Sequence, residues 1–167
     1  FAAAIAAVLL VTAATMPRSG EMPLSAMRPA EKWQEWGDPQ FDKTVGRGRM
    51  GTPLGFLYRK GIGTHAHSVL VFHLNGAFRA FDALYGIDTE EDHGNKAQFR
   101  VFRAPADGEV ERPPLYDSGS TANRRGAPGY TGRLNLTGAS YLILEVQDGG
   151  DGIQNDHADW IFPTLYR

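Results

Sequence analysis

Residues 68–74 read SVLVFHL, and this run decides the fold class. Successive side chains of a strand point to opposite faces, so Leu70, Phe72 and Leu74 share one face, opposite two valines and His73. Both faces are largely apolar. We interpret this strand as part of a sandwich of two sheets.

Seven more segments show short strand character, and each is bounded by Gly, Pro, Asn or Asp. They are residues 54–58, 78–84, 98–102, 115–117, 133–136, 141–147 and 160–165. No helical segment long enough for a crossover lies between them. The sequence therefore predicts an all-β protein, a β-sandwich or jelly roll, preceded by an N-terminal apolar segment.

The composition limits both the size and the class of the protein. A chain of 167 residues, 42% of them hydrophobic, is long enough for one domain with a core and too short for two of typical size. The formal net charge is -2 and Lys and Arg are scattered singly, so we expect no nucleic-acid partner. The lack of cysteine excludes disulfides and thiolate metal sites.

Residues 1–16 read FAAAIAAVLLVTAATM, an apolar run without an initiator Met or a basic region before it. We interpret it as the remnant of a signal peptide or membrane anchor, with a buried N-terminal helix as the alternative. Residues 17–30 carry three Pro and little pattern, which favours a linker, and the domain then covers 31–167. We therefore expect a secreted or periplasmic protein, or one anchored to the cell envelope.

The acidic segment, residues 148–160, reads DGGDGIQNDHADW and holds four of the chain's eleven Asp. So many like charges indicate either that a cation lies among them or that the loop is solvated. Ca²⁺ suits this composition, because it accepts about six to eight oxygen ligands and flexible glycines expose carbonyl groups. The candidate ligands are Asp148, Asp151, Asp156 and Asp159. The alternative is that these side chains cap turns by accepting hydrogen bonds from backbone amides.

His65 and His67 stand two residues apart in GIGTHAHS, just before the strand at 68–74. Their spacing to the other histidines matches no zinc signature, and one buried and one exposed histidine is the simpler interpretation. The chain has no cysteine, no G-x-S-x-G motif and no carboxylate pair whose spacing places both groups in one cleft. We therefore expect a noncatalytic protein.

Several motifs together carry a family resemblance. They are YRKGIGTHAHSVLVFHL (58–74), FRAFDALYGIDTE (78–90), KAQFRVF (96–102), DG followed by LYDSG (107–119) and LILEVQDGGDGIQNDHADW (142–160). In order and spacing they are similar to the NPCBM family, classed as family 51 of the carbohydrate-binding modules. The resemblance covers residues 31–167, and its specific parts are KGIGTHAHS, YGID and the acidic segment.

This resemblance implies a jelly-roll β-sandwich of the kind appended to secreted bacterial glycosidases. It implies binding of galactose-containing glycans and a structural Ca²⁺ held by the four aspartates of the acidic segment, with Asp88 of YGID as a further ligand. It also favours a Trp160 side chain that is buried as a wall beside the ion-holding segment over one that stacks on a sugar ring. We expect a monomeric module that belongs to a glycoside hydrolase or another envelope protein.

Sugar recognition needs polar groups that match hydroxyls and an aromatic face for the ring. The candidates in loops are His65, Glu91, Asp92, His93, Asn123, Arg124 and Tyr130. The alternative is a structural or protein-interaction β-sandwich on the cell envelope that has lost sugar binding. The insertion APADGEVERPP at 104–114 departs from the short link usual in the family. The wider stretch 103–130 is the least patterned part of the domain, and we expect a hairpin insertion and a mobile loop in it.

Overall fold

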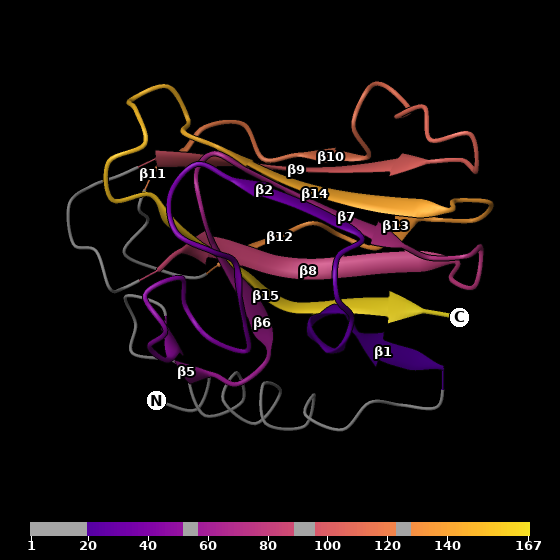
Figure 1. The fold of residues 1–167 in the computed structure, drawn as a ribbon, viewed down its shortest axis with the longest axis horizontal. Coiled ribbons are helices and arrows are strands. Elements are labelled where there is room, and N and C mark those ends of the chain that lie inside the picture. The colour runs from indigo at the N-terminus through magenta and orange to yellow at the C-terminus, as the bar shows by residue number, and fades with distance from the viewer. Residues whose placement is uncertain (1–19, 52–56, 89–95, 123–127) are drawn as a thin grey trace, which may run out of the picture.

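The computed structural model describes residues 20–51, 57–88, 96–122 and 128–167. Two sheets pack face to face, and a two-stranded ribbon lies beside them (Figure 1). Across these four ranges no helix is long and apolar enough to cross a membrane. The apolar segment predicted at 1–16 lies outside the described residues.

The first sheet has seven strands. Their bounds are β1 Glu21–Pro23, β3 Gln40–Phe41, β6 Gly61–His65, β8 Ala80–Ile87, β12 Gly129–Tyr130, β13 Leu134–Asn135 and β15 His157–Tyr166. The central path runs β12-β8-β15-β6-β3, while β1 pairs with β15 and β13 pairs with β8. The strand β15 is therefore the longest and most central element of this sheet.

The second sheet has six strands. Their bounds are β2 Glu31–Gln34, β7 Ser68–His73, β9 Lys96–Ala104, β10 Tyr116–Asp117, β11 Thr121–Ala122 and β14 Tyr141–Gln147. The path is β10-β9-β14-β7-β2, with β11 paired to β9. The ribbon consists of β4 Met50–Gly51 and β5 Leu57–Tyr58, and a single 3-10 turn, η1, covers Leu24–Ala26.

Consecutive strands alternate between the two sheets from β6 to β9, and again from β14 to β15. All the strand pairings of the described residues are antiparallel. This alternation closes the sandwich in the jelly-roll manner. The predicted all-β sandwich is confirmed.

An apolar core fills the space between the sheets. The predicted inner face of β7 lies in it, with Leu70 and Phe72 fully buried and Leu74 1% exposed. Trp160 of β15 meets Phe99 of β9 edge-on, with ring centroids 5.2 Å apart and an interplanar angle of 88°. This geometry suits an aromatic pair, and it joins one sheet to the other.

The other face of β7 is also covered, but by a smaller cluster. Val69 and Val71 pack with Phe102, Ala104 and Ile143 on the outside of the six-stranded sheet. Each of the eight segments predicted as strands contains an observed strand. In the predicted segment 54–58, residues 54–56 lie outside the described residues. The two apolar faces of SVLVFHL are thus explained by two separate clusters.

The strand β6 was not predicted, because GIGTH carries two glycines and no apolar alternation. All five of its residues are buried. A Cβ placed on Gly63 would lie 2.4 Å from the carbonyl oxygen of Lys43 and 2.5 Å from the backbone of Thr44 and Val45. The glycine is therefore required because residues 43–45 lie directly against this strand.

The domain begins earlier than predicted. The strand β1 pairs with the end of β15, and Leu24 of η1 is fully buried in the main core. Residues 21–30 therefore belong to the sandwich, and the linker predicted over 17–30 is wrong for that part. The three prolines of 17–30 favoured a linker, but the short strand β1 forms there because pairing and burial stabilise it, not local pattern.

The insertion at 104–114 joins β9 to β10, which pair as a hairpin, as predicted. Tyr141 pairs with Ala104 in the register of β14 and β9, and Gln147 pairs with Gln98. The insertion and the acidic segment therefore leave the six-stranded sheet at opposite ends (Figure 1). The insertion cannot shape a site built on the acidic segment.

We predict that Gly63→Ala destabilises the fold by about 1–3 kcal/mol, because the new methyl group must displace the backbone of residues 43–45. Gly86→Ala is the matched control, since Gly86 lies in the same sheet and a Cβ there meets no atom within 4 Å. The control should change the free energy of unfolding by less than about 0.5 kcal/mol. Urea unfolding measures both values, and equal losses would contradict the close approach at Gly63.

Candidate functional site

The acidic segment connects β14 in one sheet to β15 in the other, at one end of the sandwich (Figure 1). Gly149, Gly150 and Gly152 have φ values of 66°, 97° and 89°, which glycine adopts without strain. The Asp148 carboxylate accepts hydrogen bonds from the amides of Gly150 at 3.1 Å and Gly152 at 3.2 Å. The bond from Gly150 is the main cause that lowers the pKa of Asp148. The turn-capping alternative is thus confirmed for Asp148.

The environment of the Asp156 carboxylate differs from that of Asp148. Its side chain is fully buried, and neither carboxylate oxygen has a hydrogen-bond partner among the described residues. Burial, followed by the negative charges of Asp151 and Asp148, raises the pKa of Asp156 to about 7. A buried carboxylate of this kind is stabilised either by a proton or by a nearby cation. Asp156 therefore fits the role of a cation ligand.

Asp159 and Asp88 lie on the outer face of the seven-stranded sheet. Trp160 points into the core, so its neighbour Asp159 points away from it, and the register partners of Asp159 are Gly63 and Gly86. Asp159 and Asp88 are both 1% exposed. The Oδ2 atom of Asp88 accepts a hydrogen bond from the Gly51 amide at 3.3 Å. Asp88 therefore helps to fix the ribbon against this face.

Three of the five predicted calcium ligands, Asp148, Asp151 and Asp156, lie in the part of the acidic segment that precedes β15. The other two, Asp88 and Asp159, lie on the outer face of the seven-stranded sheet. In the four described ranges no group of three or more His, Asp or Glu side chains is placed to hold a metal ion. Glu90, Glu91, Asp92 and His93 follow Asp88 and lie outside the described residues. The Asp156 carboxylate fits a cation, because neither of its oxygens has a hydrogen-bond partner among the described residues.

An aromatic cluster lies beside Asp156. His157 and His65 are register partners at the ends of β15 and β6, with ring centroids 5.5 Å apart. Trp36, which follows β2, stacks on His157 at 5.5 Å and 25° and lies 5.1 Å from the His65 ring. Both histidines are buried, whereas Trp36 is 51% exposed. The cluster therefore presents an indole ring to solvent, supported by two buried imidazoles.

Side-chain contacts fix the connection that carries Trp36. The Gln34 side chain accepts a hydrogen bond from the His65 amide at 3.1 Å and donates one to the Trp36 carbonyl at 2.8 Å. His67 Nδ1 lies 3.0 Å from Glu35 Oε2, and its Nε2 lies 3.7 Å from Asp148 Oδ1. These contacts tie the Trp36 connection to β6 and to the acidic segment.

The predicted sugar-binding residues are not all in one place. His65 lies in the aromatic cluster but is buried, while the side chain of His67 is 30% exposed, so the interpretation of one buried and one surface histidine is confirmed. Tyr130 is exposed, donates a hydrogen bond to Asp82, and pairs with Leu84. That register places it at least about 13 Å from His157 along the strands.

The other sugar-binding candidates are Glu91, Asp92, His93, Asn123 and Arg124, and all five lie outside the described residues. The prediction that Trp160 is a buried wall is confirmed, because it is 0% exposed. Trp36 was not among the binding residues predicted from the sequence. The signal was available, since a tryptophan in the polar stretch EKWQEWGDPQ has no apolar pattern to bury it.

Comparison with solved structures shows that this fold is that of a carbohydrate-binding module. A CBM51 module from Clostridium perfringens GH95, solved in complex with methyl-galactose, has a TM-score of 0.73 and 26% identity, covering 87% of this chain and 99% of that one. The structure of the M60 catalytic domain with two CBM51 domains from Clostridium perfringens ZmpB matches with a TM-score of 0.73 and 27% identity, over 87% of this chain and 15% of that one.

The chain belongs to the NPCBM/NEW2 domain family, whose sequence profile matches residues 20–166. It is 32% identical over 130 residues to a "Putative endo-alpha-N-acetylgalactosaminidase" of Renibacterium salmoninarum. That alignment covers 75% of this chain and 8% of the relative, so this chain corresponds to one small part of a much longer protein. The resemblance identified from the motifs is confirmed.

We predict that Asp156→Asn stabilises the protein in EDTA at pH 8, by about 1–3 kcal/mol, because the variant removes a buried charge without a partner. The folded pKa of about 7 lies above the unfolded value, so wild-type stability falls as pH rises from about 4 to 7 and is then constant. The advantage of the variant should therefore shrink at pH 5, where wild-type Asp156 is protonated.

The matched control is Asp151→Asn, which removes an exposed charge of the same segment. At pH 8 it should stabilise the protein less than Asp156→Asn does, because it removes only one of the charges that raise the pKa of Asp156. At pH 5 it should change stability by less than about 0.5 kcal/mol. Thermal or urea unfolding at pH 5 and pH 8 measures these differences. A wild-type stability that rises between these pH values would contradict the raised pKa of Asp156.

Proposed function

We propose that this domain binds galactose-type glycans without catalysing a reaction on them. The observation that carries the proposal is the similarity, over 99% of its length, to a module solved with methyl-galactose bound. The aromatic cluster supports a location for the sugar. The apolar face of a pyranose can lie on the exposed ring of Trp36, while polar groups of the neighbouring acidic segment and of His67 match its hydroxyl groups.

The proposal extends to a structural Ca²⁺ in the acidic segment. What supports it is the buried Asp156 carboxylate, whose two oxygens have no hydrogen-bond partner within the described ranges. When bound, the ion would supply the positive charge that this carboxylate lacks and would oppose the repulsion from Asp148 and Asp151. It would thereby hold the segment that supports the Trp36 cluster, without taking part in chemistry.

The wider role that we propose is targeting. A noncatalytic, monomeric module on a secreted, periplasmic or envelope-anchored protein would bring an attached glycoside hydrolase to its glycan. The length of the Renibacterium relative and the catalytic domain in the ZmpB structure support such an arrangement, in which the module is one part of a larger protein. A single weak sugar site gains effective affinity when it is linked to a second one.

We predict that the chain binds methyl-galactose with a Kd in the high micromolar to millimolar range, because one sugar ring offers few atoms for contact. Trp36→Ala should weaken binding at least about fivefold by removing the ring face. Trp33→Ala is the control. Trp33 is similarly exposed, but it lies in β2, where it pairs with Val69 of β7 away from the histidine cluster. Isothermal titration calorimetry measures all three.

Binding that is unchanged in Trp36→Ala would move the site elsewhere on the domain. No binding of any galactosyl or N-acetylgalactosaminyl glycan at millimolar concentration would overturn the proposal. In that case the domain is a structural or protein-interaction unit.

We predict that EDTA lowers the melting temperature by several degrees and that Ca²⁺ restores it. Binding to the folded state alone stabilises it by about 2.7 kcal/mol when free Ca²⁺ exceeds Kd by about a hundredfold. Asp156→Asn should lose this response while remaining folded, because the neutral amide no longer supplies the buried charge. Mg²⁺ at the same concentration serves as the control, and an identical melting curve with EDTA and with Ca²⁺ would refute the site.

A further inference from the structure

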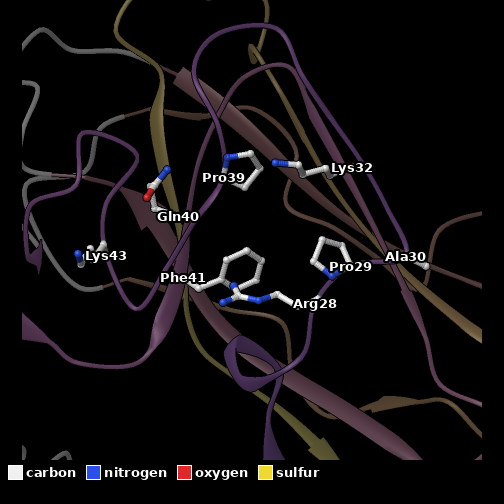
Figure 2. A pocket seen from close by; sticks show the side chains of 8 residues that line it. All are labelled: Arg28, Pro29, Ala30, Lys32, Pro39, Gln40, Phe41 and Lys43. Carbon is white, nitrogen blue, oxygen red and sulfur yellow. The ribbon is translucent and has the colours of Figure 1, made fainter.

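A surface pocket of ≈ 560 Å³ lies between the edge strands of the two sheets (Figure 2). It is lined by Lys32 of β2 and by Gln40 and Phe41 of β3, together with Arg28 and Lys43 from the adjoining segments. β2 is the edge of the six-stranded sheet and β3 is the edge of the seven-stranded sheet. The pocket thus occupies an open side of the sandwich, and its volume is within the range of small-ligand sites.

The charge of this pocket is positive. Three of its eight lining side chains are cationic, namely those of Arg28, Lys32 and Lys43, and no acid lines it. Within the described ranges, neither Arg28 nor Lys43 has a carboxylate at ion-pair distance. This concentration of one charge is unusual in a chain whose formal net charge is -2. A pocket with these properties attracts an anion.

Two of the cations are held in place. The Arg28 guanidinium lies 4.9 Å from the centroid of the Phe41 ring and runs beneath it in Figure 2. The Lys32 ammonium lies 2.9 Å from Asp38 Oδ1, so that carboxylate compensates its charge and the uncompensated charge of the pocket comes from Arg28 and Lys43. Pro39 forms a buried part of the wall. Groups that are already ordered lose less conformational entropy when a ligand binds, so the site is prepared for an anion.

The pocket is connected to the proposed sugar site. Trp36 and Pro39 belong to the same connection between β2 and β3, and three residues span at most about 11 Å. An oligosaccharide of a few rings can therefore reach from the exposed indole to the cations. The Arg28 guanidinium offers two parallel donors, which match the oxygens of a carboxylate or a sulfate ester.

We propose that the pocket formed by Arg28, Lys32, Gln40, Phe41 and Lys43 binds an acidic group, a carboxylate or a sulfate ester, on a glycan whose neutral ring lies on Trp36. This inference rests on the proposed galactose binding and adds a preference for acidic glycans to it. The cations increase affinity for the charged glycan, while the contacts to a neutral galactoside stay the same.

The test compares three probes by calorimetry on the full chain in the presence of Ca²⁺: methyl-galactose, a sulfated galactoside and a sialylated galactoside. One or both acidic probes should bind about three- to tenfold more tightly than methyl-galactose. Arg28→Gln and Lys43→Gln should each reduce that preference and leave methyl-galactose binding unchanged. The preference should also fall when NaCl is raised to about 0.5 M, because salt screens exposed charges.

The matched control is Arg79→Gln, which removes one exposed positive charge near the turn between β7 and β8 and should keep the preference. The response to the two acidic probes tells a sulfate ester from a carboxylate. Methyl-galactose binding without any preference for an acidic probe overturns this inference and leaves the proposed function intact. A preference that survives in both pocket variants also overturns it. If no probe binds, the proposed function fails as well.

Discussion

The contact between Trp160 and Phe99 fixes the orientation of the residues around it. Trp160 points into the core, so alternation along β15 sends Asp159 and His157 to the opposite face of the sheet. There His157 meets His65 across the register and supports Trp36. A shift of β15 by one residue would exchange these faces, so the packing of one indole determines where the second indole is exposed.

The acidic segment shows how differently three neighbouring carboxylates can be stabilised. Asp148 is satisfied by backbone amides that positive-φ glycines turn toward it, and Asp151 remains in solvent. The packing of the sandwich buries Asp156, and the two nearby negative charges add to the free-energy cost of ionising its carboxyl group. The chemical type is the same in each case. The environment alone decides which of them can serve a cation.

The connection between β2 and β3 lies between the two binding sites that we propose. On one side it carries Trp36, whose ring is held against two imidazoles, and on the other it borders a cationic pocket with Phe41 as its aromatic wall. Both features lie where the two sheets leave an open edge. An aromatic surface selects by shape and a cluster of cations selects by charge, so the two together can distinguish ligands that either one alone would not.

The sequence by itself determined the all-β class, the eight strand segments, the burial of Trp160 and the family, because these depend on local alternation and motifs. It did not reveal β6, since Gly63 is explained only by the backbone of residues 43–45 lying against it. It singled out the acidic segment but not the different states of Asp148 and Asp156, which follow from burial and from contacts. It also missed Trp36 and the pocket of Arg28 and Lys43. These sites bring together residues from different strands, and only the folded chain sets which side chains meet.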